Sequence, residues 1–188
     1  MDNYFISENT LMIMPYAKNK SKVIENYVSY IVNKRPFDLV NDSCKYYGSS
    51  YLGRCESTDY MIGVKYKCPI VVSEVKEIII FPTTSVKNDD CVWLNYNAIE
   101  KYYNNGQNKV VILLKNSRKF EFEISERIIS NQIFRSSRLE SVLKSKKRWF
   151  CFFLCHFYAI IILCRGVRKQ DKYLIFCLKR GLKWKLKI

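Results

Sequence analysis

The sequence contains a single histidine, His156, and residues 1–140 contain none. A serine or cysteine nucleophile needs a neighbouring base, most often histidine, so those residues cannot assemble a Ser-His or Cys-His catalytic pair. The glycine-rich motifs of phosphate-binding loops and dinucleotide-binding folds are also absent, as is the paired-histidine motif of zinc proteases. We therefore expect no catalytic residues and no enzymatic activity.

Metal-site spacing is missing as well. None of the eight cysteines forms a C-x-x-C pair, the arrangement typical of structural zinc sites. Cys151 and Cys155 precede His156, but they lie in a run of apolar residues where cysteine serves as apolar filler. The N-terminus begins acidic and polar, unlike a signal peptide. We expect reduced thiols in a cytoplasmic protein, with no metal and no cofactor.

Negative charge is scarce in only one part of the chain. The net charge is +15, of which residues 1–140 contribute +3 and residues 141–188 contribute +12. The basic character therefore belongs mostly to the last quarter of the chain. A main body at +3 can still bind DNA if its cations lie on one face.

The pattern of apolar residues predicts an α+β fold with several antiparallel strands, a mid-chain helix and a C-terminal helix. Pro36 favours a helix start and Gly48 a helix end, and Ser125 can cap a helix that runs to about Lys144. The segment Tyr51–Ile62 is compatible with helix or strand. The expected strands are Thr10–Pro15, Val23–Val32, Ile70–Val72, Glu77–Phe81, Cys91–Tyr96, Lys109–Leu114 and Lys119–Ile124.

The composition changes near residue 143. Residues 141–188 contain no Asn, Glu, Thr or Pro, whereas residues 1–140 contain fourteen Asn. A sixteen-residue apolar run, Trp149–Cys164, is flanked by basic residues. This tail could be a core helix, a membrane anchor, or an unrelated or frame-shifted sequence, and we favour the third. We expect a domain over 1–143 and an atypical basic, apolar tail over 144–188.

The thirteen residues from Asp42 to Arg54 combine two glycines, three serines, three tyrosines and two cations. Cations and hydroxyls can bind phosphate oxygens, and glycine allows close approach of a backbone. The alternative is a helix end followed by a polar turn. Gly48 and Gly53 are not expected to follow a strand, or to open a helix in the manner of a phosphate-binding loop.

The stretch Ser43–Arg54 resembles the competence transcription factor (ComK) family. Lys67–Val72, Ile80–Thr83 and Trp93 follow in family order, so the resemblance covers about residues 4–143. It implies a sequence-specific activator of DNA-uptake genes in Gram-positive bacteria, located in the cytoplasm at the nucleoid. Such a protein binds paired A/T-rich boxes in double-stranded promoter DNA, largely through the minor groove. It acts as a homo-oligomer, and adaptor-protease regulation is a further implication.

The candidate DNA contacts are basic or hydroxyl residues close to these motifs. Arg54 ranks first among them, because arginine suits a narrow A/T-rich minor groove. Tyr46, Tyr47, Trp93 and Phe122 are expected to pack in the core or on a sheet. The alternative function is a basic protein anchored to a membrane by residues 149–164. The full candidate set is Lys45, Ser49, Ser50, Arg54, Lys65, Lys67, Arg118 and Lys119.

Overall fold

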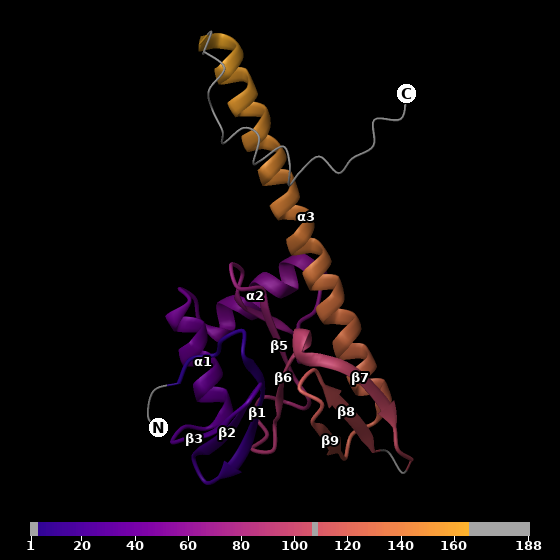
Figure 1. Cartoon of the computed structure of the whole chain (residues 1–188). Coiled ribbons are helices and arrows are strands. Elements are labelled where there is room, and N and C mark those ends of the chain that lie inside the picture. Colours follow the sequence, from indigo (N-terminus) through magenta and orange to yellow (C-terminus); the bar gives the residue numbers. More distant parts are fainter. Residues whose placement is uncertain (1–3, 107–108, 166–188) are drawn as a thin grey trace. The chain divides into compact units, whose positions relative to one another are not determined.

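The computed structural model describes residues 4–106 and 109–165 (Figure 1). The chain forms two units, Met1–Leu143 and Lys144–Ile188. The elements, in chain order, are β1 (Thr10–Ala17), β2 (Lys20–Glu25), β3 (Ser29–Val32), α1 (Pro36–Tyr46), α2 (Tyr51–Ile62), β4 (Ile70–Ser73), β5 (Ile78–Pro82), β6 (Trp93–Asn95), the 3-10 helix η1 (Tyr96–Ala98), β7 (Ile99–Asn104), β8 (Val110–Leu114), β9 (Lys119–Phe122) and α3 (Glu126–Arg165).

Two antiparallel sheets form the first unit. The larger has six strands in the order β3-β2-β1-β6-β5-β4, and the smaller has three in the order β7-β8-β9. The hairpins β4–β5 and β8–β9 are those that the sequence predicts. The combination of antiparallel sheets with helices confirms the α+β fold class.

Strands β4, β5 and β6 of the six-stranded sheet are buried on both faces. Side chains alternate along a strand, so Ile13 and Trp93 join the cluster that contains α1 and α2. Their neighbours Met12 and Leu94 join a second cluster with strand β8 and Ile129 of α3. The first unit therefore has three layers: helices α1 and α2, the large sheet, and the small sheet with the start of α3 (Figure 1). Trp93 is in the core, as predicted.

Local signals at both ends determine that Tyr51–Ile62 is a helix. The side chain of Ser50 accepts a hydrogen bond from the backbone of Gly53, which satisfies one free N–H group of the first turn. Gly63 ends the helix with a left-handed φ of 69°, which glycine adopts without a steric cost. The ambiguity of the sequence pattern is thereby resolved.

The prediction of one strand over Val23–Val32 is wrong, because a turn divides this segment into parts of β2 and β3. The N–H of Glu25 donates to the carbonyl of Val28 at 2.9 Å, and Tyr27 at the turn is 92% exposed. Tyrosine and valine are typical strand residues, so the composition conceals the turn.

Two further elements differ from the expectation. Strand β7 was not predicted, and α3 continues to Arg165, well beyond Lys144. The apolar run Trp149–Cys164 is part of this helix. No helix among the residues that the structure describes is long and apolar enough to cross a membrane. The rest of the predicted tail, residues 166–188, lies outside the described residues.

Candidate nucleic-acid interface

A tight corner joins α1 to α2 and contains four of the eight candidate residues. The N–H of Gly48 donates to the carbonyl of Lys45 at 2.9 Å. Gly48 has a φ of 83°, so the chain turns there through a conformation that favours glycine. Ser50 follows in an extended conformation and caps α2. The stretch leads into α2, but it follows α1 and not a strand, so it lacks the strand–loop–helix order of a phosphate-binding loop.

Gly53 lies close to the serine hydroxyls of this corner. A Cβ atom at this position would lie 2.9 Å from Oγ of Ser49, so a larger residue there would displace the Ser49 hydroxyl. That Oγ lies 3.4 Å from the carbonyl oxygen of Ser50, next to the first turn of α2. The corner therefore gathers two serine hydroxyls beside a helix N-terminus.

The Arg54 side chain lies inside this corner. It is only 15% exposed, and its Nη2 donates to the carbonyl of Tyr47 at 3.0 Å. Its Nη1 lies 3.9 Å from a carboxylate oxygen of Glu74 in the β4–β5 turn. The guanidinium thus fastens α2 to the end of α1, and little of it faces solvent.

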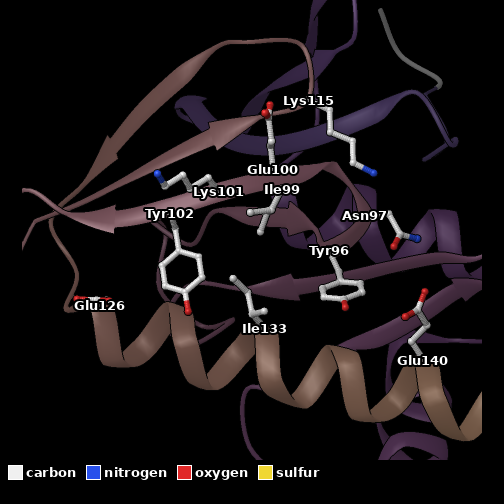
Figure 2. Close-up of a pocket in the computed structure, with 10 residues that line it drawn as sticks. All are labelled: Tyr96, Asn97, Ile99, Glu100, Lys101, Tyr102, Lys115, Glu126, Ile133 and Glu140. Atoms are coloured by element: carbon white, nitrogen blue, oxygen red, sulfur yellow. The ribbon is translucent and has the colours of Figure 1, made fainter.

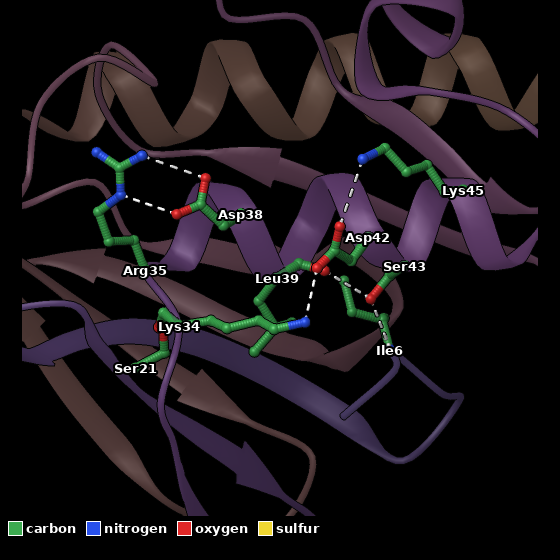
Figure 3. A network of polar contacts seen from close by, with 9 residues as sticks. All are labelled: Ile6, Ser21, Lys34, Arg35, Asp38, Leu39, Asp42, Ser43 and Lys45. Carbon is green, nitrogen blue, oxygen red and sulfur yellow. Dashed lines mark hydrogen bonds and ion pairs between the residues drawn. The ribbon is translucent and has the colours of Figure 1, made fainter. Parts of the chain in front are cut away.

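Lys45 is exposed but has a carboxylate nearby (Figure 3). Its Nζ lies 3.6 Å from Asp42, whose other oxygen accepts a hydrogen bond from Lys34 at 2.7 Å. The hydrogen bond from Lys34 is the main cause that lowers the pKa of Asp42 below its usual value. Arg35 and Asp38 form a second pair at 2.8 Å on the first turn of α1. Two cations thus share Asp42, and this surface retains a net positive charge.

Lys65 and Lys67 follow the C-terminal end of α2, and both are exposed. The backbone of their segment is fastened to α3. Gln132 donates to the carbonyl of Lys67 at 2.9 Å, and Arg135 donates to that of Tyr66 at 3.2 Å. The two lysines therefore project from a fixed backbone.

The last two candidates lie on the small sheet, in another layer of the first unit. Arg118 donates to the hydroxyl of Ser29 at 3.3 Å, and Asn116 donates to the carbonyl of Asn26 at 3.2 Å. The β8–β9 turn therefore contacts the β2–β3 turn. Lys119 begins β9 and is exposed. The structure brings together the four corner candidates and places Lys65 and Lys67 beyond α2. Arg118 and Lys119 lie on the small sheet.

An exposed aromatic pair beside the corner was not predicted. The rings of Phe5 and Tyr46 stack with centroids 4.3 Å apart and an angle of 17° between the planes. Tyr46 is 63% exposed, so its assignment to the core is wrong. The hydroxyl of Tyr47 donates to the carbonyl of Ile6 at 3.0 Å and ties the N-terminal segment to α1. No sequence signal connects residues so far apart in the chain.

A groove of about 700 Å³ lies between η1, β7 and α3 (Figure 2). Two tyrosines, Tyr96 and Tyr102, point from the strand side toward the helix. The lining of the groove contains the three carboxylates of Glu100, Glu126 and Glu140 and the two ammonium groups of Lys101 and Lys115, so the groove has no excess of positive charge to attract phosphates. None of the candidate residues lines this groove.

Within residues 4–106 and 109–165, no group of histidine, cysteine and acidic side chains could hold a metal ion. The described corner combines cations, hydroxyls, a helix start and exposed rings. These residue types bind anions and stack on flat ligands.

Comparison with known proteins assigns this α+β domain to a family. The sequence profile of the ComK protein family matches residues 1–148, and the chain belongs to that family. It is similar to the competence transcription factor of Bacillus subtilis (strain 168), with 27% identity over 149 residues, which cover 78% of each chain. No solved structure matches.

Proposed function

We propose that this chain is a competence transcription factor, a sequence-specific DNA-binding activator of DNA-uptake genes. The observation that carries the proposal is the family match over residues 1–148, together with a relative that is named a competence transcription factor. The stretch that resembles the family most specifically forms the corner between α1 and α2. In this proposal the protein has no catalytic role.

In the proposed complex, the corner contacts the DNA backbone. Lys45 and Ser50 are exposed there, and the first turn of α2 carries no acidic residue. The positive end of the helix dipole is therefore not offset by a side chain, which favours a phosphate at that position. Arg54 supports the contact from inside by fixing Tyr47 and the turn. Ser49 adds a hydroxyl beside Ser50.

Other candidates extend the proposed surface. Lys65 and Lys67 project from the segment after α2. Arg118 and Lys119 form a separate basic patch on the small sheet. A/T-rich minor grooves are narrow and have enhanced negative potential, so they attract basic side chains. We propose A/T-rich boxes in double-stranded promoter DNA as the target, bound by a homo-oligomer in the cytoplasm. Regulation through an adaptor and a protease is part of the same proposal.

A mobility-shift titration at fixed salt tests the proposal. The full chain should bind a duplex with paired A/T-rich boxes more tightly than a G/C-rich duplex of equal length. Affinities must be compared at one salt concentration, because counterion release dominates them. Equal affinity for both duplexes would contradict sequence-specific binding.

A variant pair locates the contact. Lys45→Ala should weaken binding to both duplexes and reduce the slope of log affinity against log salt by about one, as loss of one phosphate contact does. Lys18→Ala is the matched control, because Lys18 is an exposed lysine of the β1–β2 turn outside the candidate set. Equal effects of the two substitutions would remove the corner from the interface.

A further inference from the structure

Two cysteines far apart in the sequence lie against each other between α2 and the segment before β4. The Sγ atom of Cys68 donates to the Sγ atom of Cys55 at 2.8 Å. We propose that Cys55 and Cys68 are a redox-active dithiol, which an external disulfide converts into an intramolecular disulfide. This inference does not depend on the proposed DNA-binding function.

The polypeptide on both sides of the pair is fixed by hydrogen bonds. Thr58 lies one helical turn after Cys55 on the same side of α2, and its hydroxyl donates to the carbonyl of Pro69 at 2.8 Å in a buried contact. Gln132 of α3 donates to the carbonyl of Lys67 at 2.9 Å. Cys68 is thus held between two fixed carbonyls.

Little movement separates the dithiol from a disulfide. A disulfide bond places two sulfur atoms about 2.05 Å apart, so the Cys55 and Cys68 sulfurs need to approach by less than one ångström. The hydrogen bonds donated by Thr58 and Gln132 involve neither sulfur atom. They can persist in the oxidised state and hold the two chain segments in the same register.

The two thiols have different environments. Cys68 is 1% exposed, whereas Cys55 is only partly buried. Hydrogen bonding from Cys68 is the largest of the causes that lower the pKa of Cys55, and Tyr51 acts in the same direction. The hydrogen bond to Cys55 and then burial raise the pKa of Cys68. Cys55 is therefore the attacking thiolate and Cys68 the resolving thiol.

The reaction consists of two exchanges. The Cys55 thiolate attacks one sulfur of the external disulfide, a mixed disulfide forms, and the first external thiolate leaves. Cys68 then loses its proton to solvent and its sulfur attacks Sγ of Cys55, which expels the second external thiolate. The two cysteines lose two electrons in total, and the external disulfide gains them and becomes two thiols.

Two other described cysteines are poor competitors. Cys44 belongs to the same cluster but is fully buried, and burial raises its pKa to about 11. Cys91 is 3% exposed, and burial raises its pKa as well. Neither is expected to form the first mixed disulfide.

Peptide mapping of the full chain tests the proposal. The reduced protein is treated with oxidised glutathione, its remaining thiols are alkylated, and the digest is analysed by mass spectrometry. The expected product is a cross-linked peptide pair containing Cys55 and Cys68, two hydrogens lighter than its reduced parts. Cys68→Ser should instead retain glutathione on Cys55, and Cys55→Ser should leave Cys68 reduced. Cys91→Ser, the control, should still give the cross-link.

Two further measurements use the wild-type protein and therefore do not depend on whether a variant folds. In the reduced wild-type protein, Cys55 should react with iodoacetamide faster than Cys68 or Cys91. Oxidation of the wild-type protein should raise its melting temperature by roughly 5–10 °C, because the bond closes a short loop of the unfolded chain. A cross-link from Cys55 to Cys44, a first adduct on Cys68, or oxidation of other cysteines without this cross-link would overturn the proposal.

Discussion

The charged side chain of Arg54 has a structural role. Its guanidinium donates to the carbonyl of Tyr47 and is mostly buried. Arg54→Ala would leave that carbonyl without its partner, so we expect the free energy of unfolding to fall by about 1–3 kcal/mol. Urea unfolding followed by circular dichroism measures this loss. Lys45→Ala is the control and should leave stability nearly unchanged, because Lys45 is exposed.

The same variant separates the two roles of Arg54. The sequence predicts a direct DNA contact, whereas the structure places the side chain in the corner. If Arg54→Ala keeps full stability and loses affinity for A/T-rich DNA by roughly 5- to 150-fold, as a loss of about 1–3 kcal/mol at a groove contact implies, the contact role holds. Reduced stability would assign Arg54 to the corner.

Asp42 should make stability depend on pH. Its folded-state pKa is lowered, mainly by Lys34, so the carboxylate stabilises the fold above its unfolded pKa near 3.9. That contribution is lost as the pH falls through the lowered value. Both partners are about one third exposed, which limits the effect to about 1 kcal/mol or less.

Substitution of Asp42 tests this dependence. Asp42→Asn should flatten the decrease in unfolding free energy as the pH falls below about 4, from the unfolded pKa through the lowered folded value, because the substituted residue does not titrate. Urea unfolding at several pH values measures the slope. Asp90→Asn, in an exposed loop, is the control and should keep the wild-type slope. An unchanged slope in Asp42→Asn would exclude the ion pair as a source of stability.

The burial of a single residue could be predicted where the residue type alone determines it. Trp93, a large apolar side chain within an expected strand, lies in the core as predicted. The prediction failed for Tyr46, which lies off the buried face of α1 that is formed by Leu39, Val40, Ser43 and Cys44. Aromatic character alone does not determine burial; the position on the helix does.

Helix α2 depends on its first turn. The side chain of Ser50 accepts the N–H of Gly53 at 3.1 Å, and a serine cap of this kind stabilises a helix by about 1 kcal/mol. Ser50→Ala should therefore lower the free energy of unfolding by about that amount, measured by chemical denaturation. Ser50→Asn can still accept the bond and should retain most of the stability. Equal loss in both variants would mean that the cap does not contribute.

Elements with strong local patterns were predicted and those without were not. The β4–β5 and β8–β9 hairpins combine apolar, β-branched strands with turn residues. Strand β7 is mostly exposed, so its residues show no clear apolar period. The turn within Val23–Val32 is formed by residues that usually favour strands. In the last two cases pairing with neighbouring strands overrides the local signal.

At the scale of the whole chain, the two units should differ in their contribution to stability. We expect removal of residues 149–188 to leave the thermal unfolding of the first unit nearly unchanged, because, among the residues whose burial the structure describes, all members of the three core clusters precede residue 144. Differential scanning calorimetry of the shortened and full chains measures this. A decrease of several degrees in melting temperature would show that the removed part stabilises the first unit.

The same shortened chain tests the role of the concentrated charge. The removed residues 149–188 contain nine Lys and Arg residues against one Asp and so contribute +8 of the net charge, and such a segment attracts nucleic acid without sequence preference. The full chain should therefore bind G/C-rich duplex more strongly than the shortened chain at low salt. The difference should shrink as salt increases, and a salt-independent difference would contradict this explanation.

The candidate site could be predicted only in part. The order of residues 42–54 indicates a helix end, a turn and nearby cations, and the structure has all three. The distribution of the eight candidates over the corner, the segment after α2 and the small sheet follows from tertiary packing. The stack of Phe5 on Tyr46 follows from it too, so local pattern could not predict it.

The burial of the centre of the large sheet on both faces has a consequence for how the molecule opens over time. Met12 and Ile13 of β1, and Leu94 and Trp93 of β6, have a hydrogen-bonded strand on each edge and buried side chains. Their amide hydrogens can exchange with solvent only when the first unit opens as a whole. Strand β3, at an edge and largely exposed, can open alone. Amide hydrogens at the centre of the large sheet should therefore exchange slowly, whereas those of the edge strand β3 should exchange through small local fluctuations.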